Sequence, residues 1–143
     1  MIIKQLSVFL ENKSGRLTEV TEALASAGVN ISAFSIADTA EFGILRMIVN
    51  KPEQAERALK DHGISVHITD VIGVVVPHEP GGLHRTLKIL SAEGISVEYM
   101  YAFIERSGKD AVIIFRFDDI DRAIKVLTEN KIVVLPGEKV YSL

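Results

Sequence analysis

Gly15 and Gly81 each lie where a predicted strand turns into a predicted helix, and polar residues surround both of them. Glycine adopts backbone angles that other residues resist, and it lets a ligand come close to the main chain. The helix after each glycine offers unpaired N–H groups and the positive end of its dipole, which suit a carboxylate. A carbonyl, an asparagine or a glutamate nearby could bind an ammonium group. Together these groups would recognise a free α-amino acid.

The same residues also have a purely structural interpretation. Glycine is common at strand–helix turns, and Ser14 or Asn12 would then do no more than cap the helix. The residue types alone leave both interpretations open.

The two glycines belong to an internal repeat. With an offset of 66 residues Gly28 falls on Gly94, and later in the chain, with an offset of 68, Leu59 falls on Leu127. A repeat of this length is a whole small domain, because solenoid units are shorter. The chain therefore consists of two similar modules, predicted to span residues 1–69 and 70–143.

Each module has the predicted element order βαββαβ. Strands are expected at Ile2–Leu10, Val29–Ile36, Ile44–Val49 and from Ile64, then at Val71–Val76, Ile95–Ile104, Ala111–Phe117, Ile132–Leu135 and Val140–Leu143. Helices are expected from Leu17, after an Asn50 cap, from Leu83 and after Asp118–Asp121. This order predicts an α+β protein made of two ferredoxin-like modules, each an antiparallel sheet with helices on one face. The β-sequence from Val66 to Val76 leaves no linker, so we expect the modules to pair side by side and cover exposed edges.

Composition limits the possible partners. The net charge is −3 and basic residues are scattered, which argues against nucleic acid or an anionic membrane. There is no cysteine, and no apolar run approaches the length of a membrane span. We expect a cytoplasmic protein, and one that forms a homodimer because small sheets with free edges tend to pair.

Catalytic and metal-binding patterns are missing from the sequence. It contains no nucleophile elbow, phosphate-binding loop or dinucleotide fingerprint. The four histidines show no metal-ligand spacing. Asp118, Asp119 and Asp121 lack the glycine and glutamate of a calcium loop, so a helix cap is the better interpretation. We therefore expect no enzyme activity, no metal and no cofactor.

A family resemblance sharpens this prediction. The segment Asn12–Leu17 followed by Gly28–Ile31 resembles the ACT domain, a small βαββαβ ligand-binding module of amino-acid metabolism. The segment His78–Leu83 followed by Gly94–Val97 is similar to the same signature. The resemblance covers the whole chain as two tandem modules with no catalytic domain attached. It implies a regulatory protein that binds a free amino acid and controls a partner such as a metabolic enzyme.

The resemblance also implies the residues of the site. ACT domains bind ligands between paired modules, against the first strand–helix turn of one and the neighbouring strand of the other. By motif position, the first module contributes Asn12, Ser14, Gly15, Arg16, Leu17, Asn30 and Ile31. The second module contributes Glu79, Gly81, Gly82, Leu83, Ser96, Val97 and Glu98.

The two signatures are not identical. Many family members have proline directly before the glycine, a position that Pro80 holds in the second module, whereas the first module has Ser14. Ser96 stands where the first module has Asn30. We therefore expect two sites of unequal affinity or specificity.

Two alternatives stay open. The aromatic-rich run of Tyr99, Met100, Tyr101 and Phe103 could enlarge the second pocket, or two of the four could simply face the core. The chain could also be an adaptor that has lost its ligand and regulates a partner enzyme through a sheet edge or a helix face. Only the first function predicts thermal stabilisation by a particular free amino acid.

Overall fold

The computed structural model describes residues 1–39, 41–104 and 109–142, with residues 103 and 104 described by their backbone alone. Along this part of the chain lie β1 (Ile3–Glu11), α1 (Arg16–Ser26), β2 (Ile31–Asp38), β3 (Phe42–Val49), α2 (Pro52–Asp61), β4 (Val66–Pro77), α3 (Gly82–Ala92), β5 (Val97–Ile104), β6 (Asp110–Phe117), α4 (Ile120–Glu129) and α5 (Gly137–Tyr141). No helix within these ranges is long and apolar enough to cross a membrane.

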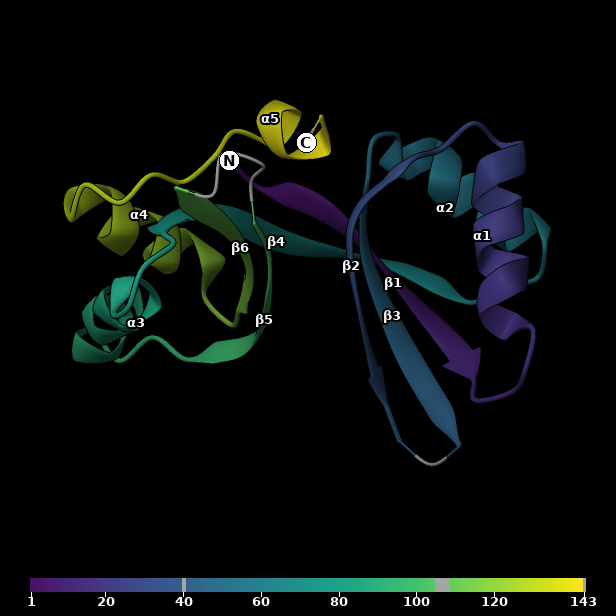
Figure 1. The fold of residues 1–143 in the computed structure, drawn as a ribbon, viewed down its shortest axis with the longest axis horizontal. Coiled ribbons are helices and arrows are strands. Elements are labelled where there is room, and N and C mark those ends of the chain that lie inside the picture. The colour runs from purple at the N-terminus through teal and green to yellow at the C-terminus, as the bar shows by residue number, and fades with distance from the viewer. Residues whose placement is uncertain (40, 105–108, 143) are drawn as a thin grey trace. The chain divides into compact units, whose positions relative to one another are not determined.

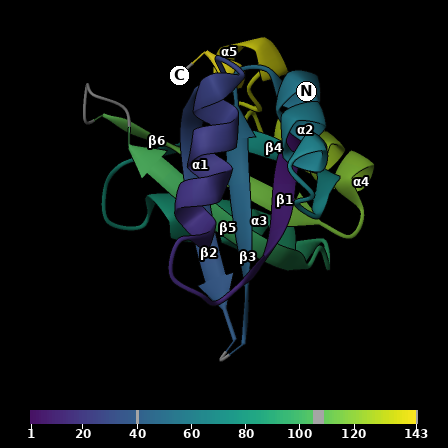
Figure 2. The ribbon, with the colours of Figure 1, turned by 90° about the vertical axis from the view of Figure 1, so that its right-hand side faces the viewer.

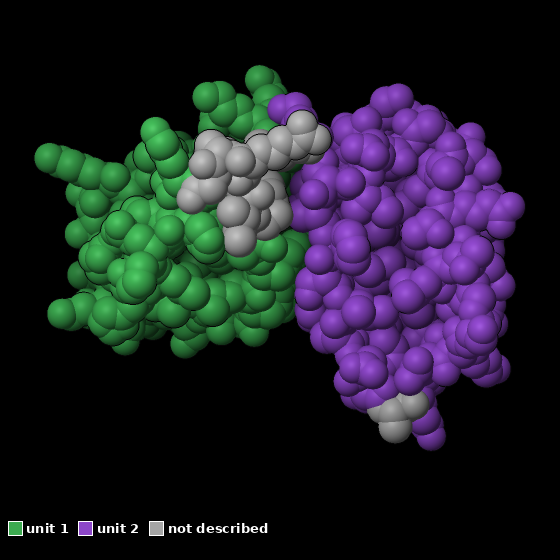
Figure 3. All heavy atoms as spheres, in the orientation of Figure 1, with its two compact units in different colours: residues 1–3, 70–140 green, residues 4–69, 141–143 purple. Residues whose placement is uncertain are grey.

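The chain separates into two compact units, which Figure 3 draws in different colours. One unit contains residues 4–69 and 141–143, and the other contains residues 1–3 and 70–140. These units differ from the predicted modules only in the short terminal segments. Below, the first module is the unit around residues 4–69, and the second module is the unit around residues 70–140.

The first module is an antiparallel sheet with two helices on one face. Its strands lie in the order β2-β3-β1, followed by the start of β4. Leu6, Val8 and Leu10 alternate along β1 and join Val20 and Leu24 of α1 in one apolar core. Helices α1 and α2 lie side by side over this face of the sheet (Figures 1 and 2). The predicted ferredoxin-like arrangement is confirmed.

The second module repeats this arrangement. The rest of β4 pairs with β6, and β6 pairs with β5, both antiparallel. Its core contains Val74 of β4, Leu90 of α3 and Leu127 of α4. Phe115 and Phe117 stack within this core with their ring centroids 5.3 Å apart. Each module thus has an apolar core of its own.

Strand β4 continues from the first module into the second. Its 12 residues, Val66–Pro77, form one uninterrupted strand. The continuous β-sequence that predicted a junction without a linker is therefore confirmed at this point. How the two modules pair stays a prediction.

The C-terminal segment differs from its prediction. Strands were expected at Ile132–Leu135 and Val140–Leu143, but a single bridge joins Val134 to Val74 and helix α5 follows. The hydrogen-bonded pairing of this segment with β4 stops at Pro136, because proline has no N–H to donate.

Helix α5 begins directly after this proline and packs on the second module. The amides of Lys139 and Val140 donate to the carbonyl oxygen of Pro136 at 3.1 and 3.4 Å. A Cβ atom at Gly73 would lie 3.0 Å from Cγ2 of Val140 and 3.3 Å from Cδ1 of Ile3. A glycine in the apolar β4 therefore makes room for the helix that replaces the expected strand.

The start of α2 also differs from its prediction. The residue that precedes the helix is Lys51, which makes no side-chain cap, and Pro52 follows in the first turn as expected. Asn50 does not cap the helix. Its Oδ1 accepts a hydrogen bond from the amide of Asn30 at 2.9 Å, and its own amide donates to the carbonyl of Asn30 at 3.1 Å. The asparagine therefore joins the ends of β2 and β3.

Candidate functional site

The turn between β1 and α1 is held by its main chain. Gly15 has a φ of +89°, in the left-handed region that favours glycine, and directly precedes the helix. The amide of Arg16 donates to the carbonyl of Lys13 at 3.3 Å, and the amide of Glu19 donates to that of Gly15 at 3.0 Å. The glycine thus sets the angle at which the chain enters the helix.

The first turn of α1 offers free donors. Among the described residues, no acceptor receives the amides of Leu17 and Thr18. The capping role weighed for Ser14 and Asn12 is therefore not filled. These amides lie at the positive end of the helix dipole and can bind a carboxylate.

The second module reproduces this turn atom for atom in its main chain. Gly81 has a φ of +85° and directly precedes α3. The amide of Gly82 donates to the carbonyl of Glu79 at 3.1 Å, and the amide of Arg85 donates to that of Gly81 at 3.0 Å. The two turns are therefore the same backbone structure with different side chains.

A cavity of about 200 Å³ lies beside the turn of the first module. Its apolar lining comes from Leu10, Leu17, Ile36 and Gly43. Its polar lining comes from Glu11, Asn12, Lys13, Arg16 and Asp38. Three of the predicted site residues, Asn12, Arg16 and Leu17, thus line one cavity, which reaches across to the end of β2.

The cations of this cavity are already paired with acids. The ammonium of Lys13 lies 2.8 Å from a carboxylate oxygen of Glu11. The guanidinium of Arg16 lies 3.0 Å from a carboxylate oxygen of Glu19 and 3.6 Å from one of Glu11. The hydrogen bond from Lys13, followed by the positive charges of Lys13 and Arg16, lowers the pKa of the Glu11 carboxyl. Because these pairs are exposed, a ligand carboxylate can compete for the same cations.

Asp38 is a lining residue that the sequence did not predict. It is the last residue of β2, and its carboxylate makes no ion pair or hydrogen bond within the described residues. The place of Asp38 beside the turn follows from the strand register, which pairs it with Gly43 on β3. A carboxylate in this place can bind an ammonium group.

Asn30 and Ile31 lie at the other end of the same sheet. Gly43 pairs with both Leu10, beside the turn, and Asp38. Ile31 is seven residues before Asp38, which is about 23 Å along an extended strand. Within one module the structure therefore does not bring these two predicted residues to the turn.

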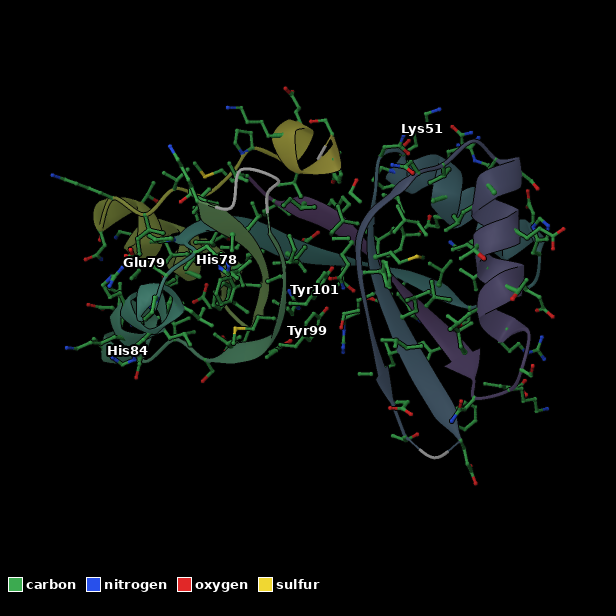
Figure 4. The ribbon with its side chains drawn as sticks, in the orientation of Figure 1. Lys51, His78, Glu79, His84, Tyr99 and Tyr101 are labelled. Carbon is green, nitrogen blue, oxygen red and sulfur yellow. The ribbon has the colours of Figure 1, made fainter. Side chains whose placement is uncertain are left out.

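The turn of the second module has different side chains. Figure 4 shows His78 and Glu79 in this turn and His84 on the helix that follows it. The guanidinium of Arg85 lies 2.6 Å from a carboxylate oxygen of Glu79. Gly82 is packed closely, since a Cβ atom there would lie 2.1 Å from the carbonyl oxygen of Pro77. Gly81 and Gly82 thus shape the main chain and provide no polar group.

The remaining predicted residues of the second module are spread along the sheet. Leu83 packs partly buried against the core. Ser96, Val97 and Glu98 lie at the start of β5, far from the turn, since Val97 pairs with the last residue of β6. Glu98 forms an ion pair of 3.3 Å with Arg116.

The tyrosines of β5 cannot enlarge a pocket on the helix side. Tyr99 and Tyr101 pair with Arg116 and Ile114, on the face of the sheet opposite the helices (Figure 4). Met100 is on the helix side but is 41% exposed. None of the three belongs to the core, and the side chain of Phe103 lies outside the described residues.

In the described ranges, no group of three or more histidine, aspartate or glutamate side chains is placed to hold a metal ion.

Comparison with known proteins gives a family and a close structural relative. The model of a family described as an ACT domain pair matches residues 1–143. The crystal structure of protein BT0572 from Bacteroides thetaiotaomicron is 50% identical in sequence, with a TM-score of 0.96. That alignment covers 100% of this chain and 98% of the other. No curated protein sequence matches significantly.

More distant structures share the fold. The regulatory subunit of aspartate kinase from Thermus thermophilus, in its ligand-free form, is 14% identical with a TM-score of 0.60, over 88% of this chain and 91% of that one. The corresponding subunit from Thermus flavus is 14% identical with a TM-score of 0.59, over 90% and 94% of the two chains.

Proposed function

Since the chain belongs to the ACT domain pair family, we propose that it is a non-enzymatic regulatory protein that binds a free amino acid at the strand–helix turn of its first module. One observation carries this proposal. The cavity of the first module combines groups suited to a carboxylate with an unpaired acid suited to an ammonium. A free α-amino acid carries both groups a short distance apart.

The carboxylate of the ligand binds at the start of α1. The amides of Leu17 and Thr18 donate to it, and the guanidinium of Arg16 adds a charge-assisted hydrogen bond. The ammonium binds to Asp38 across the cavity. Leu10 and Ile36 contact the ligand side chain. The small size of the cavity favours a compact amino acid.

Pairing with a second copy of the chain completes this site. The outer edge of β2 has no partner among the described strands. The apolar side chains of Phe34, Ile36 and Leu17 beside it are 69%, 50% and 47% exposed. If two β2 strands pair antiparallel across a twofold axis, Asn30 of one copy comes beside Asp38 of the other. The residues that one module keeps about 23 Å apart then meet at one ligand.

Only the first module has the full set of groups. In the second turn, Glu79 replaces Lys13 and Gly82 replaces Arg16, so the ligand carboxylate meets an acid and loses a cation. The proposed amino-acid site is therefore the first one.

Regulation follows from the differential affinity of the ligand for the paired form. An amino acid that contacts both copies stabilises the dimer, and the dimer presents a different surface to a metabolic enzyme than the monomer does. The ligand is thus the signal and the assembly is the response.

A thermal-shift screen of the whole chain against the twenty amino acids, followed by calorimetry, tests this function. We expect an upward shift with one or two amino acids. Arg16→Gln should weaken binding about tenfold, whereas Arg57→Gln, at an exposed arginine of the same module, should leave it unchanged. Equal affinities for both variants would place the ligand elsewhere.

A second experiment tests the pairing. Phe34→Asp should give a monomer in analytical ultracentrifugation and should lose amino-acid binding with it. Binding of undiminished affinity by a monomer would contradict the shared site.

A further inference from the structure

The second module contains a cavity of about 350 Å³ on the other side of its strand–helix turn. The cavity lies between α3, the end of β4 and residues 131–133. Val75, Ile89, Ile132 and Val133 give it a mainly apolar wall. Arg85, Thr86, Asp110 and Lys131 supply its polar groups. This volume is within the range of small-molecule sites.

The first module has an equivalent cavity, which differs in its volume and in its charged residues. It has about 230 Å³ and lies between α1, the end of β1 and residues 63–65. Its charged residues are paired with one another, since Arg16 contacts Glu19 at 3.0 Å and Glu11 at 3.6 Å. Comparison of equivalent positions in the two modules therefore shows which residues are particular to the second cavity.

Thr86 is the first unusual residue of the second cavity. It is 4% exposed, and its hydroxyl makes no hydrogen bond within the described residues. The equivalent residue of the first module is Val20, which is fully buried in the core. Its hydroxyl reaches solvent, since no buried side-chain oxygen or nitrogen of the described residues is without a partner. Because Thr86 lines the cavity, its hydroxyl is available to a ligand there.

Lys131 is the second unusual residue. Its φ is +61°, the one positive value among the described residues other than glycine. The equivalent residue of the first module is Gly63, with a φ of +71°. Lysine in this conformation is strained. Its ammonium pairs with no described residue.

The strained Lys131 and the solvent-accessible hydroxyl of Thr86 thus line the same cavity, and local backbone strain gathers at functional sites. We propose that this cavity is a second ligand site, which takes a small zwitterion with an aliphatic side chain. Lys131 binds its carboxylate, Asp110 binds its ammonium, and the hydroxyl of Thr86 donates to or accepts from either group. Asp110 pairs with no other side chain in the described ranges. The wall of valine and isoleucine contacts the aliphatic part.

This site is separate from the turn site proposed above, because the two cavities share no residue and belong to different modules. The second site is inferred only from the residues that line its own cavity. One experiment can therefore support either site without the other.

The test is an NMR titration of the full-length, ¹⁵N-labelled chain with L-leucine, L-isoleucine and L-valine. We expect saturable shifts of the amides of residues 131–133 with at least one of these probes. Thr86→Val, which installs the residue of the first module and so keeps the fold, should weaken this binding about fivefold. Lys131→Gly, again the residue of the first module, should weaken it about tenfold.

Thr128→Val is the matched control, because the hydroxyl of Thr128 on α4 is exposed and donates to the carbonyl of Ile124. We expect it to bind the probe as the unaltered chain does. The proposal is overturned if these amides do not shift with any probe up to about 10 mM. It is also overturned if Thr86→Val binds as well as Thr128→Val. Shifts confined to residues 12–17 would overturn this site and leave the turn site standing.

Discussion

The two strand–helix turns have the same main-chain hydrogen bonds and nearly opposite side chains. Lys13 of the first turn corresponds to Glu79 of the second, and Glu19 corresponds to Arg85. The left-handed glycines, at +89° and +85°, and the hydrogen bonds around them hardly differ. The same main-chain structure is thus compatible with two different sets of charges. The two turns are therefore one main-chain scaffold with different charges on it.

The largest predicted effect is a difference in stability between substitutions at equivalent, but differently packed, positions of the two turns. Gly82→Ala should lower the free energy of unfolding by about 3 kcal/mol, because its Cβ would overlap the carbonyl oxygen of Pro77. Arg16→Ala, at the equivalent position, should cost about 0.5 kcal/mol, since it removes only exposed ion pairs. Urea unfolding of both variants measures the difference. Similar values would mean that the two turns tolerate a side chain equally.

The second predicted effect is a loss of stability that should be the same in both modules. Gly15→Ala and Gly81→Ala should each cost about 1.5 kcal/mol, because alanine is strained at a positive φ. A Cβ at Gly15 would meet nothing within 4 Å, and one at Gly81 would meet only the Arg85 side chain at 3.4 Å. A difference of more than about 1 kcal/mol between the two variants in urea unfolding would show that the turns are not the same scaffold.

A third substitution should make the second module more like the first. Lys131→Gly should raise the free energy of unfolding by about 1 kcal/mol, since it relieves the strain at a φ of +61°. Lys125→Gly, inside the neighbouring helix α4, should lower it by about the same amount. Thermal unfolding of the pair, without ligand, checks the sign. A destabilised Lys131→Gly variant would show that the lysine side chain stabilises the fold.

The smallest effect concerns pH and is confined to the first module, because Pro77 occupies the position equivalent to Glu11. The pKa of Glu11 is lowered in the folded chain, so its contribution is present above its ordinary value of 4.5 and is lost as the pH falls through the folded value. Glu11→Gln should therefore reduce the loss of stability in this acidic window. NMR titration of the Glu11 carboxyl should give a pKa below 4.5, and Lys13→Met should raise it. A Glu11 carboxyl that titrates unchanged in Lys13→Met would mean that the lysine does not lower its pKa.

Local signals in the sequence predicted much of the fold. Gly15 and Gly81 adopt the left-handed conformation, and Asp119 caps α4 by accepting the amide of Arg122 at 3.2 Å. These features depend on a few neighbouring residues and need no knowledge of the rest of the chain. The apolar run that forms β4 was also readable, because its length leaves no room for a turn.

Other features depend on contacts between distant segments. Asn50 had two possible partners, the start of α2 and the start of β2, and only the fold decides that it bonds to Asn30. Pro136 ends the pairing with β4, so helix α5 forms in place of the strand that was expected at the C-terminus. Asp38 became a candidate only through the pairing register.

A signal for the second cavity was present in the sequence. The offset that aligns the repeat places Thr86 on the buried Val20, and Lys131 on Gly63. A polar residue on a core position and a lysine on a glycine position are the differences from which we propose the site. Their meaning depended on the structure, which shows that the two residues line one cavity.

The assignment of the terminal segments has a consequence for any attempt to divide the chain. Residues 1–3 belong to the second module, and residues 141–143 belong to the first. A chain divided between residues 69 and 70 would therefore leave each half without a short terminal segment that belongs to its compact unit.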